Sequence, residues 1–82
     1  MVRAFMFLNV APGSEANVLQ HLKTIGAVEE AFVSYGVYDL IIRVKGETAE
    51  ELKDVVTGQI RGTKGVLSTL TLMVIEEQKG RS

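Results

Sequence analysis

The feature that most constrains the fold lies near the middle of the chain, where two apolar, β-prone runs meet at one glycine. Residues 33–44 read Val-Ser-Tyr-Gly-Val-Tyr-Asp-Leu-Ile-Ile-Arg-Val, with Gly36 between the two runs. A glycine there favours a tight connection between neighbouring strands, because it reaches backbone conformations that other residues avoid. The sequence therefore predicts two adjacent strands, over residues 28–35 and 38–45, and this pair divides the chain into two halves.

The first half opens with a strand and a helix. Residues 2–10 are apolar at nearly every position and end at a Pro-Gly turn, which predicts a central strand buried on both sides. Ser14 is placed to cap a helix whose apolar residues recur at helical spacing, and Gly26 is a natural end for that helix.

The second half repeats this order after its own strand. Thr48 and Glu51 form a capping box, which predicts a helix that ends near Gly62. A last strand is expected over residues 66–75. The predicted order of strand, helix, strand, strand, helix and strand is that of a ferredoxin-like α+β fold (βαββαβ). Such a fold has a four-stranded antiparallel sheet with two helices on one face.

Size and composition limit the classes of function. The chain has 82 residues, enough for one domain, which we assign to residues 1–76 with a polar tail over 77–82. Nine basic and ten acidic residues give a net charge of −1, which argues against direct nucleic-acid binding. With no cysteine and a single histidine, His21, we expect no metal site and no cofactor. No apolar run has the length of a membrane span and no signal peptide is evident, so a cytoplasmic protein is expected by elimination.

Two helices cover only one face of such a sheet, and the strand pattern predicts what the other face carries. We assign to the helix side Ala4, Met6, Leu8, Ala31, Val33, Leu40, Ile42, Val44, Leu70, Leu72 and Val74. The opposite, open face then carries Phe5, Phe7, Phe32, Ile41 and Met73, interrupted by Arg43, Thr69 and Thr71. An apolar patch of this size usually marks an interface, so we predict a dimer formed by two open faces. In the alternative, one strand faces the other way and hides the phenylalanines under the helices.

The chemistry-bearing residues indicate binding and not catalysis. No Ser-His-Asp or Cys-His set is available with one histidine, and we assign no catalytic residue. Asp39 can pair with an ammonium group, and the backbone N–H groups around Gly36 can bind a carboxylate. Ser68, Thr69 and Thr71 add hydroxyl groups from the last strand. In the alternative, Gly36 and Asp39 only shape a hairpin and the threonines only suit a strand.

Two motifs resemble a known family. Gly36-Val37-Tyr38-Asp39-Leu40 is similar to the Gly-x-Tyr-Asp-Leu motif of the effector-binding domain of Lrp/AsnC (feast/famine) transcriptional regulators. Residues 65–71, Gly-Val-Leu-Ser-Thr-Leu-Thr, resemble the family's Gly-Val-x-x-Thr-x-Thr. The resemblance extends from Val2 to Glu76.

The resemblance implies dimers formed through the open sheet face, which assemble further into tetramers or octamers. It also implies that an amino acid binds in a cleft between dimers. The family's motif positions are Gly36, Tyr38, Asp39, Thr69 and Thr71 here, with Tyr35 and Ser68 as neighbours. Typical members carry a DNA-binding helix-turn-helix before this domain, whereas here Met1 leads directly into the first strand. The resemblance therefore predicts a stand-alone form that senses an amino acid, or that assembles with a full-length regulator.

Two other classes of function are compatible with the same fold. One is a small dimeric ferredoxin-like enzyme of the monooxygenase or isomerase type, for which Asn9, Gln20 and His21 are the nearest candidate residues. The other is an assembly module that binds no ligand. We expect a binding domain and not an enzyme, because these three polar residues show no spacing that brings them together.

Overall fold

The computed structural model describes residues 1–75, and it has the predicted order of elements. The elements are β1 (Val2–Val10), α1 (Glu15–Leu22), β2 (Val28–Val33), β3 (Leu40–Gly46), α2 (Ala49–Asp54), the π-helix η1 (Val55–Ile60) and β4 (Val66–Met73). The four strands form one antiparallel sheet, which confirms the ferredoxin-like α+β prediction. The tail assigned to residues 77–82 lies outside the described residues.

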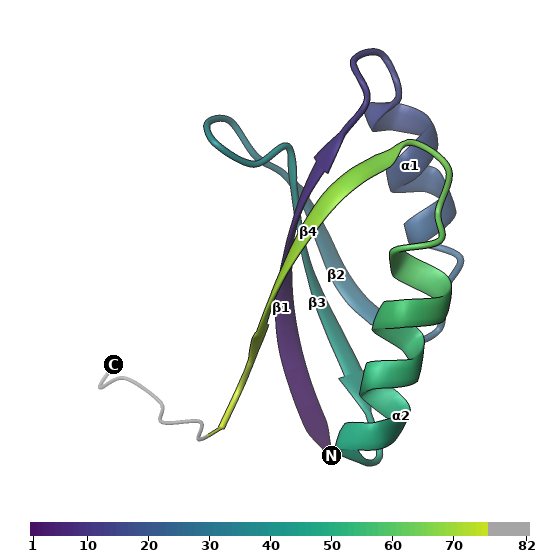
Figure 1. The fold of residues 1–82 in the computed structure, drawn as a ribbon, viewed down its shortest axis with the longest axis vertical. Helices are drawn as coiled ribbons and strands as arrows, with labels where there is room; N and C mark the ends of the chain where they lie inside the picture. The colour runs from purple at the N-terminus through teal and green to yellow at the C-terminus, as the bar shows by residue number, and fades with distance from the viewer. Residues whose placement is uncertain (76–82) are drawn as a thin grey trace.

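The sheet has the strand order β2-β3-β1-β4, so β1 and β3 are central while β2 and β4 are the edges. Both helices lie on the same side of this sheet (Figure 1). Helix α2 packs on β3 and β1, and α1 packs on β2. Within residues 1–75, no helix is both long enough and apolar enough to cross a membrane.

The core fills the space between the sheet and the helices. The side chains that β1 and β3 direct toward the helices alternate along each strand, as strand geometry requires, and they are fully buried. From the sheet these are Ala4, Met6, Leu8, Leu40, Ile42 and Val44, and they meet Val18, Leu22, Leu52 and Ile60 from the helical segments.

The two helices begin differently. Thr48 Oγ1 accepts a hydrogen bond from the Glu51 N–H (3.1 Å), as predicted, but Glu51 Oε2 accepts from the N–H of Glu47 (3.3 Å) and not from that of Thr48. Ser14 occupies the predicted cap position of α1, yet its side chain makes no capping hydrogen bond. Its backbone is in the helical region (φ −98°, ψ −2°), not in the extended conformation typical of an N-cap.

The second helix widens in its last turns. Residues Val55–Ile60 are π-helical, and the hydrogen bond from the Arg61 N–H to the Val56 carbonyl (3.0 Å) has the five-residue spacing of that conformation. Val55, Val56 and Ile60 are all buried, so the wider turn directs three apolar side chains into the core. The sequence did not predict this departure from a regular α-helix.

The register of the strands confirms which residues lie on the open face. Residues that pair across an antiparallel sheet share a face, and Phe7 pairs with Ile41, which in turn pairs with Phe32. Phe5 pairs with Arg43 on the same face. The alternative in which the phenylalanines lie under the helices is therefore excluded.

The prediction for the last strand was wrong by one position. Leu70 pairs with Phe7 and Leu72 pairs with Phe5, so both leucines lie on the open face. Conversely Thr69, Thr71 and Met73 pair with Leu8, Met6 and Ala4, which places all three on the helix side. The assignment assumed that the more apolar side of every strand faces the helices. It fails on β4, an edge strand whose Leu70 and Leu72 lie on the face that the helices do not cover.

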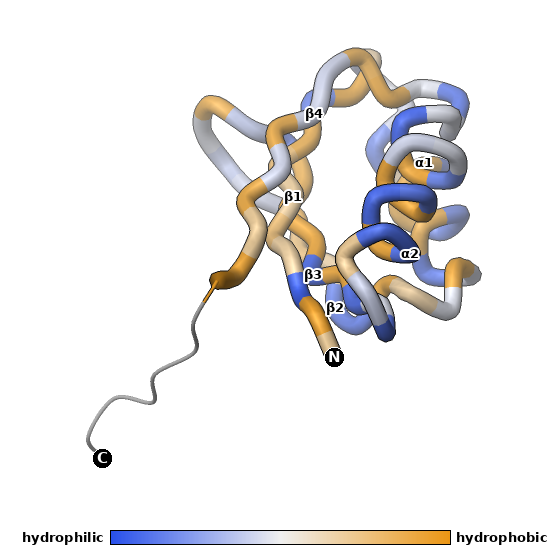
Figure 2. Tube along the Cα trace, turned by 60° about the horizontal axis from the view of Figure 1, so that its bottom comes forward, coloured by the Kyte–Doolittle hydropathy of each residue, from blue (hydrophilic) through white to orange (hydrophobic). Residues whose placement is uncertain are grey.

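We call Phe5, Phe7, Phe32, Ile41, Leu70 and Leu72 the apolar patch. Its exposed fractions are substantial: 38% for Phe5, 50% for Phe32, 43% for Leu70 and 51% for Leu72. Figure 2 shows the side of the sheet away from the helices without any covering element, although the strands are coloured largely as apolar. Exposed apolar surface of this extent is typical of an interaction face.

Candidate functional site

The predicted hairpin lies between β2 and β3 and projects from one end of the sheet (Figure 1). Gly36 has φ +142°, a conformation that L-residues with a side chain rarely adopt, so a glycine is required at this position. Tyr35 and Val37, on either side of it, are exposed. β2 ends earlier than predicted, at Val33, and β3 begins later than predicted, at Leu40, because the hairpin is longer than a tight turn.

Asp39 joins the hairpin to the centre of the sheet. Its Oδ2 accepts a hydrogen bond from the Val10 N–H (2.9 Å), and its own N–H donates to the Leu8 carbonyl (2.9 Å). Its carbonyl accepts from the Ser34 N–H (2.8 Å). The carboxylate lies where β1 has an irregularity between Asn9 and Val10, so it satisfies a backbone donor that the sheet leaves unpaired. Asp39 therefore has a structural role, and its other oxygen, Oδ1, makes no hydrogen bond to any residue in the described part of the chain.

Tyr38 packs on the apolar patch. Its ring centroid lies 5.4 Å from that of Phe7 with the planes tilted by 54°, an arrangement typical of favourable aromatic pairs. Ser68 is on the same face of the sheet, where its Oγ accepts a hydrogen bond from Asn9 Nδ2 (3.3 Å). The hairpin, Tyr38, Asp39 and Ser68 thus gather at one end of the open face.

The two predicted threonines do not join this group. Thr69 and Thr71 lie on the helix side of β4, and Thr69 Oγ1 accepts a hydrogen bond from Arg61 Nε (3.3 Å). The predicted ligand-binding residues therefore form two sets on opposite faces of one sheet. Within a single protomer they do not line a common pocket.

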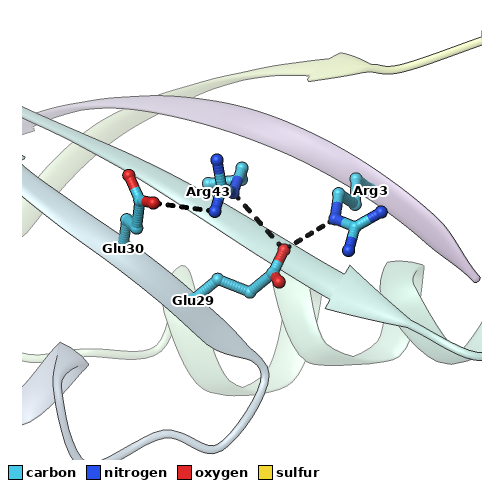
Figure 3. Close-up of polar contacts among 4 residues, drawn as sticks. All are labelled: Arg3, Glu29, Glu30 and Arg43. Atoms are coloured by element: carbon cyan, nitrogen blue, oxygen red, sulfur yellow. Dashed lines mark hydrogen bonds and ion pairs between the residues drawn. The ribbon is translucent and has the colours of Figure 1, made fainter. Parts of the chain in front are cut away.

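A charge network occupies the open face at the other end from the hairpin, and sequence reasoning missed it (Figure 3). Glu29 Oε1 lies 2.9 Å from Arg3 Nε and 3.4 Å from Arg43 Nε, while Arg43 Nη2 donates to Glu30 Oε1 (2.8 Å). The hydrogen bond from Arg3 holds the pKa of Glu29 below its usual value, and the positive charges of Arg3, Arg43 and Lys45 act in the same direction.

The available signal for this network was the alternation of the strands. Side chains alternate between the two faces along a strand, and this alternation places both Arg3 and Arg43 on the open face. The position of Glu29 could not be predicted, because it follows from an irregularity in the β2–β3 pairing between Val28 and Glu30.

The residues considered for an enzyme are dispersed. Asn9 is on the open face with Ser68, whereas His21 is exposed on α1 and lines a groove with Ser14, Asn17 and Lys64. Across residues 1–75, no three His, Cys, Asp or Glu side chains gather closely enough to hold a metal ion.

A model of the Lrp/AsnC ligand-binding domain matches residues 3–82. The chain belongs to the Lrp/AsnC ligand-binding domain family. Its fold is shared with FFRP-DM1, which is 37% identical, with a TM-score of 0.89 over 92% of this chain and 100% of that protein. It also resembles the transcriptional regulator NMB0573 of Neisseria meningitidis, whose structure is a complex with L-Met. That regulator is 16% identical, with a TM-score of 0.85 over 96% of this chain and 53% of the regulator, a likeness of fold alone.

Among curated proteins, the chain is similar to the homocitrate synthase of Saccharolobus islandicus. The two are 36% identical over 61 residues, which are 74% of this chain. The match spans only 13% of that enzyme's length. The family match shows that this chain is a ligand-binding domain of the Lrp/AsnC type.

Proposed function

We propose that this domain binds a free amino acid at a cleft between subunits and that binding changes its oligomeric assembly. The single observation that carries the proposal is the position of Asp39 on the open face beside the exposed apolar patch. There one carboxylate oxygen is fixed by Val10 and the other is free among the described residues. A carboxylate held in this way can bind an ammonium group without losing its own support.

The open face supplies the assembly part of the proposal. Two copies that pack through their apolar patches bury the side chains that one copy leaves exposed, and a small domain gains stability in this way. Since such a dimer places the hairpin of one copy near other subunits, Gly36, Tyr38 and Asp39 become part of a shared cleft. A ligand bound there shifts the equilibrium between two oligomeric states only to the extent that it binds one of them more tightly than the other.

Support for an amino acid as the ligand comes from the family and from one relative in fold. The family model describes a ligand-binding domain, and NMB0573 was solved with L-Met. We infer that a full-length regulator of the same family is a further partner, that the protein acts in the cytoplasm, and that the domain binds its ligand without catalysis.

The test is calorimetric titration of the protein with each standard amino acid, followed by sedimentation velocity with and without any that binds. The matched variant is Asp39→Asn, which keeps an oxygen for the Val10 N–H but removes the charge that an ammonium group needs. We expect at least one amino acid to bind the wild type, to change its sedimentation coefficient, and to bind Asp39→Asn at least about 10-fold more weakly. Absence of binding by every amino acid would rule out sensing.

A further inference from the structure

A groove beside α1 has a chemistry that the proposed amino-acid site does not use. It lies between α1, the turn that precedes this helix and the first residues of β4, and it has a volume of about 570 Å³. This volume is within the range of small-molecule sites. Its lining includes Ser14, Asn17, His21, Lys64, Gly65 and Leu67.

Close contacts between α1 and the loop before β4 fix the walls of the groove. Gly65 has φ +99°, and a Cβ atom there would lie 2.9 Å from Val18 Cγ2 and 3.2 Å from Ser14 Cβ. A residue with a side chain is therefore both strained and crowded at this position. The Ala11 N–H also donates to the Gly65 carbonyl (2.8 Å), which holds the loop against the end of β1. The groove is thus formed within a single protomer.

A β-bulge directs a leucine into the groove. Asn9 pairs with Ser68 and Val10 pairs with Val66, so Leu67 is an extra residue on β4 that has no partner on β1. A bulge changes the direction of the side chain that it carries, and bulges are frequent next to functional sites. Leu67 is 67% exposed and lines the groove, where it offers an apolar surface to a ligand.

Three polar side chains lie in a row along the groove. Ser14, Asn17 and His21 are three and four residues apart, a spacing that places them on one face of a helix over a length of about 10 Å. Ser14 makes no capping hydrogen bond, and the side chains of Asn17 and His21 make no hydrogen bond or ion pair within residues 1–75. The row therefore has unused hydrogen-bonding groups.

The charge of the groove lining is positive. Lys64 contributes an ammonium group, and no acidic side chain among the described residues lines the groove. A lysine binds phosphate as a compact point charge, whereas a carboxylate is bound best by the fork of an arginine. Ser14 lies against Gly65, the residue after Lys64, so its hydroxyl is placed to donate to the same group. This end of the groove favours a phosphate.

We propose that this groove is a second ligand site, which binds an adenine nucleotide such as adenosine monophosphate. Lys64 and Ser14 bind the phosphate, and Leu67 contacts the face of the adenine ring. The Asn17 amide donates to N7 of the ring and accepts from the N6 amino group, a pairing to which asparagine is suited. The inference goes beyond the proposed function and does not rest on it, since Asp39 is not part of the groove lining.

The probes are adenosine monophosphate, inosine monophosphate and adenosine. In calorimetric titrations of the full chain we expect saturable binding of adenosine monophosphate with a dissociation constant of about 1 mM or tighter. Inosine monophosphate has an oxygen in place of the N6 amino group and should bind at least about 5-fold more weakly. Adenosine lacks the phosphate and should bind at least about 10-fold more weakly. Lack of saturable binding of adenosine monophosphate at about 10 mM overturns the proposal, and so does equal affinity for either of the other probes.

Three variants at exposed positions locate the binding. Lys64→Gln should weaken adenosine monophosphate by about 10-fold and leave adenosine unchanged, because it removes a charge that pairs with the phosphate alone. Asn17→Ala should weaken adenosine monophosphate by about 5-fold and abolish the preference over inosine monophosphate. Lys53→Gln, on α2 and outside the groove, is the charge-matched control and should leave the affinity unchanged. Wild-type affinity in Lys64→Gln overturns the assignment, and so does an equal loss in Lys53→Gln.

Asp39→Asn separates the two proposed sites. It should leave the titration with adenosine monophosphate unchanged while it weakens any amino acid bound at the hairpin. Loss of nucleotide binding in Asp39→Asn would overturn the second site, because both ligands would then share the hairpin. Absence of amino-acid binding alone would reject the proposed function and leave the groove proposal standing.

Discussion

The two faces of the sheet differ in what covers their apolar side chains. On the helix side, Met6, Leu8, Leu40 and Ile42 are fully buried by the protein's own helices. On the open face, equally apolar side chains such as Phe32 and Leu72 remain about half exposed. Both faces carry apolar residues, yet the chain supplies a cover for only one of them.

One protomer buries the apolar side chains of its core by itself, but it leaves the apolar patch on the open face exposed. Burial of the helix side is intramolecular and independent of protein concentration, whereas burial of the apolar patch requires a second molecule. Substitutions on the two faces should therefore be detected by different measurements. The predictions below use this difference, beginning with the largest expected effect.

A matched pair of leucine truncations tests the difference directly. Leu8→Ala removes a fully buried side chain and should lower the free energy of unfolding by about 2–5 kcal/mol. Leu70→Ala, on the open face, should lower it by less than about 1 kcal/mol in dilute protein, where no partner covers the site. Chemical denaturation at several protein concentrations measures both, and equal losses at high dilution would contradict the comparison.

A charge placed on the apolar patch should act on assembly. Leu72→Glu should raise the dimer dissociation constant by about 100-fold, equivalent to about 2.7 kcal/mol, because a carboxylate would be buried in an apolar interface. Leu67→Glu is the control, since Leu67 is an exposed leucine on the same strand that lines a groove beside α1. Sedimentation equilibrium compares the two, and a wild type that stays monomeric at high concentration would refute the interface.

The hairpin connection predicts a smaller, local effect. Asp39→Ala leaves the Val10 N–H without its acceptor and should cost about 1–3 kcal/mol, while Asp39→Asn should cost less than about 1 kcal/mol. Amide hydrogen exchange at Val10 reports on this bond. Equal protection in wild type and Asp39→Ala would show that the carboxylate is not what holds the end of β1.

The charge network predicts the smallest effect, on the dependence of stability on pH. Since the pKa of Glu29 is lowered in the folded protein from its usual value of 4.5, the folded state binds fewer protons than the unfolded state in that range. The stabilisation is present above pH 4.5 and is lost as the pH falls through the lowered pKa. Surface ion pairs contribute little, so the change should be modest.

Glu29→Gln removes this contribution. The variant should be less stable than wild type near neutral pH, and the two should converge in acid, as measured by thermal unfolding at a series of pH values. Glu50→Gln is the control, because Glu50 forms no ion pair with the described residues. A constant difference between wild type and Glu29→Gln across the acid range would contradict the lowered pKa.

One residue of the candidate site and one helix cap were predictable from local sequence. Gly36 was identified because only a glycine readily adopts the backbone conformation found there, and Thr48 because a capping box has a fixed spacing. The hydrogen bond from Val10 to Asp39 was not predictable, since it joins residues 29 positions apart through an irregularity in β1. Thr69 and Thr71 lie on the opposite face of the sheet from Asp39 because of the register of β4. No local sequence pattern specifies that register.

The sequence by itself determined the order of elements and the place of the hairpin, and it predicted the open-face position of Phe5, Phe7 and Phe32 that the strand register then confirmed. These depend on hydrophobic period, glycine and capping residues, which act over a few neighbouring positions. Only the tertiary structure decided which face Leu70 and Thr71 occupy, because a strand's side chains alternate and a shift of one residue exchanges its faces. β4 is an edge strand, and its apolar pattern does not indicate which of its sides faces the helices. Its pairing with β1 decides which side chains lie on the helix side.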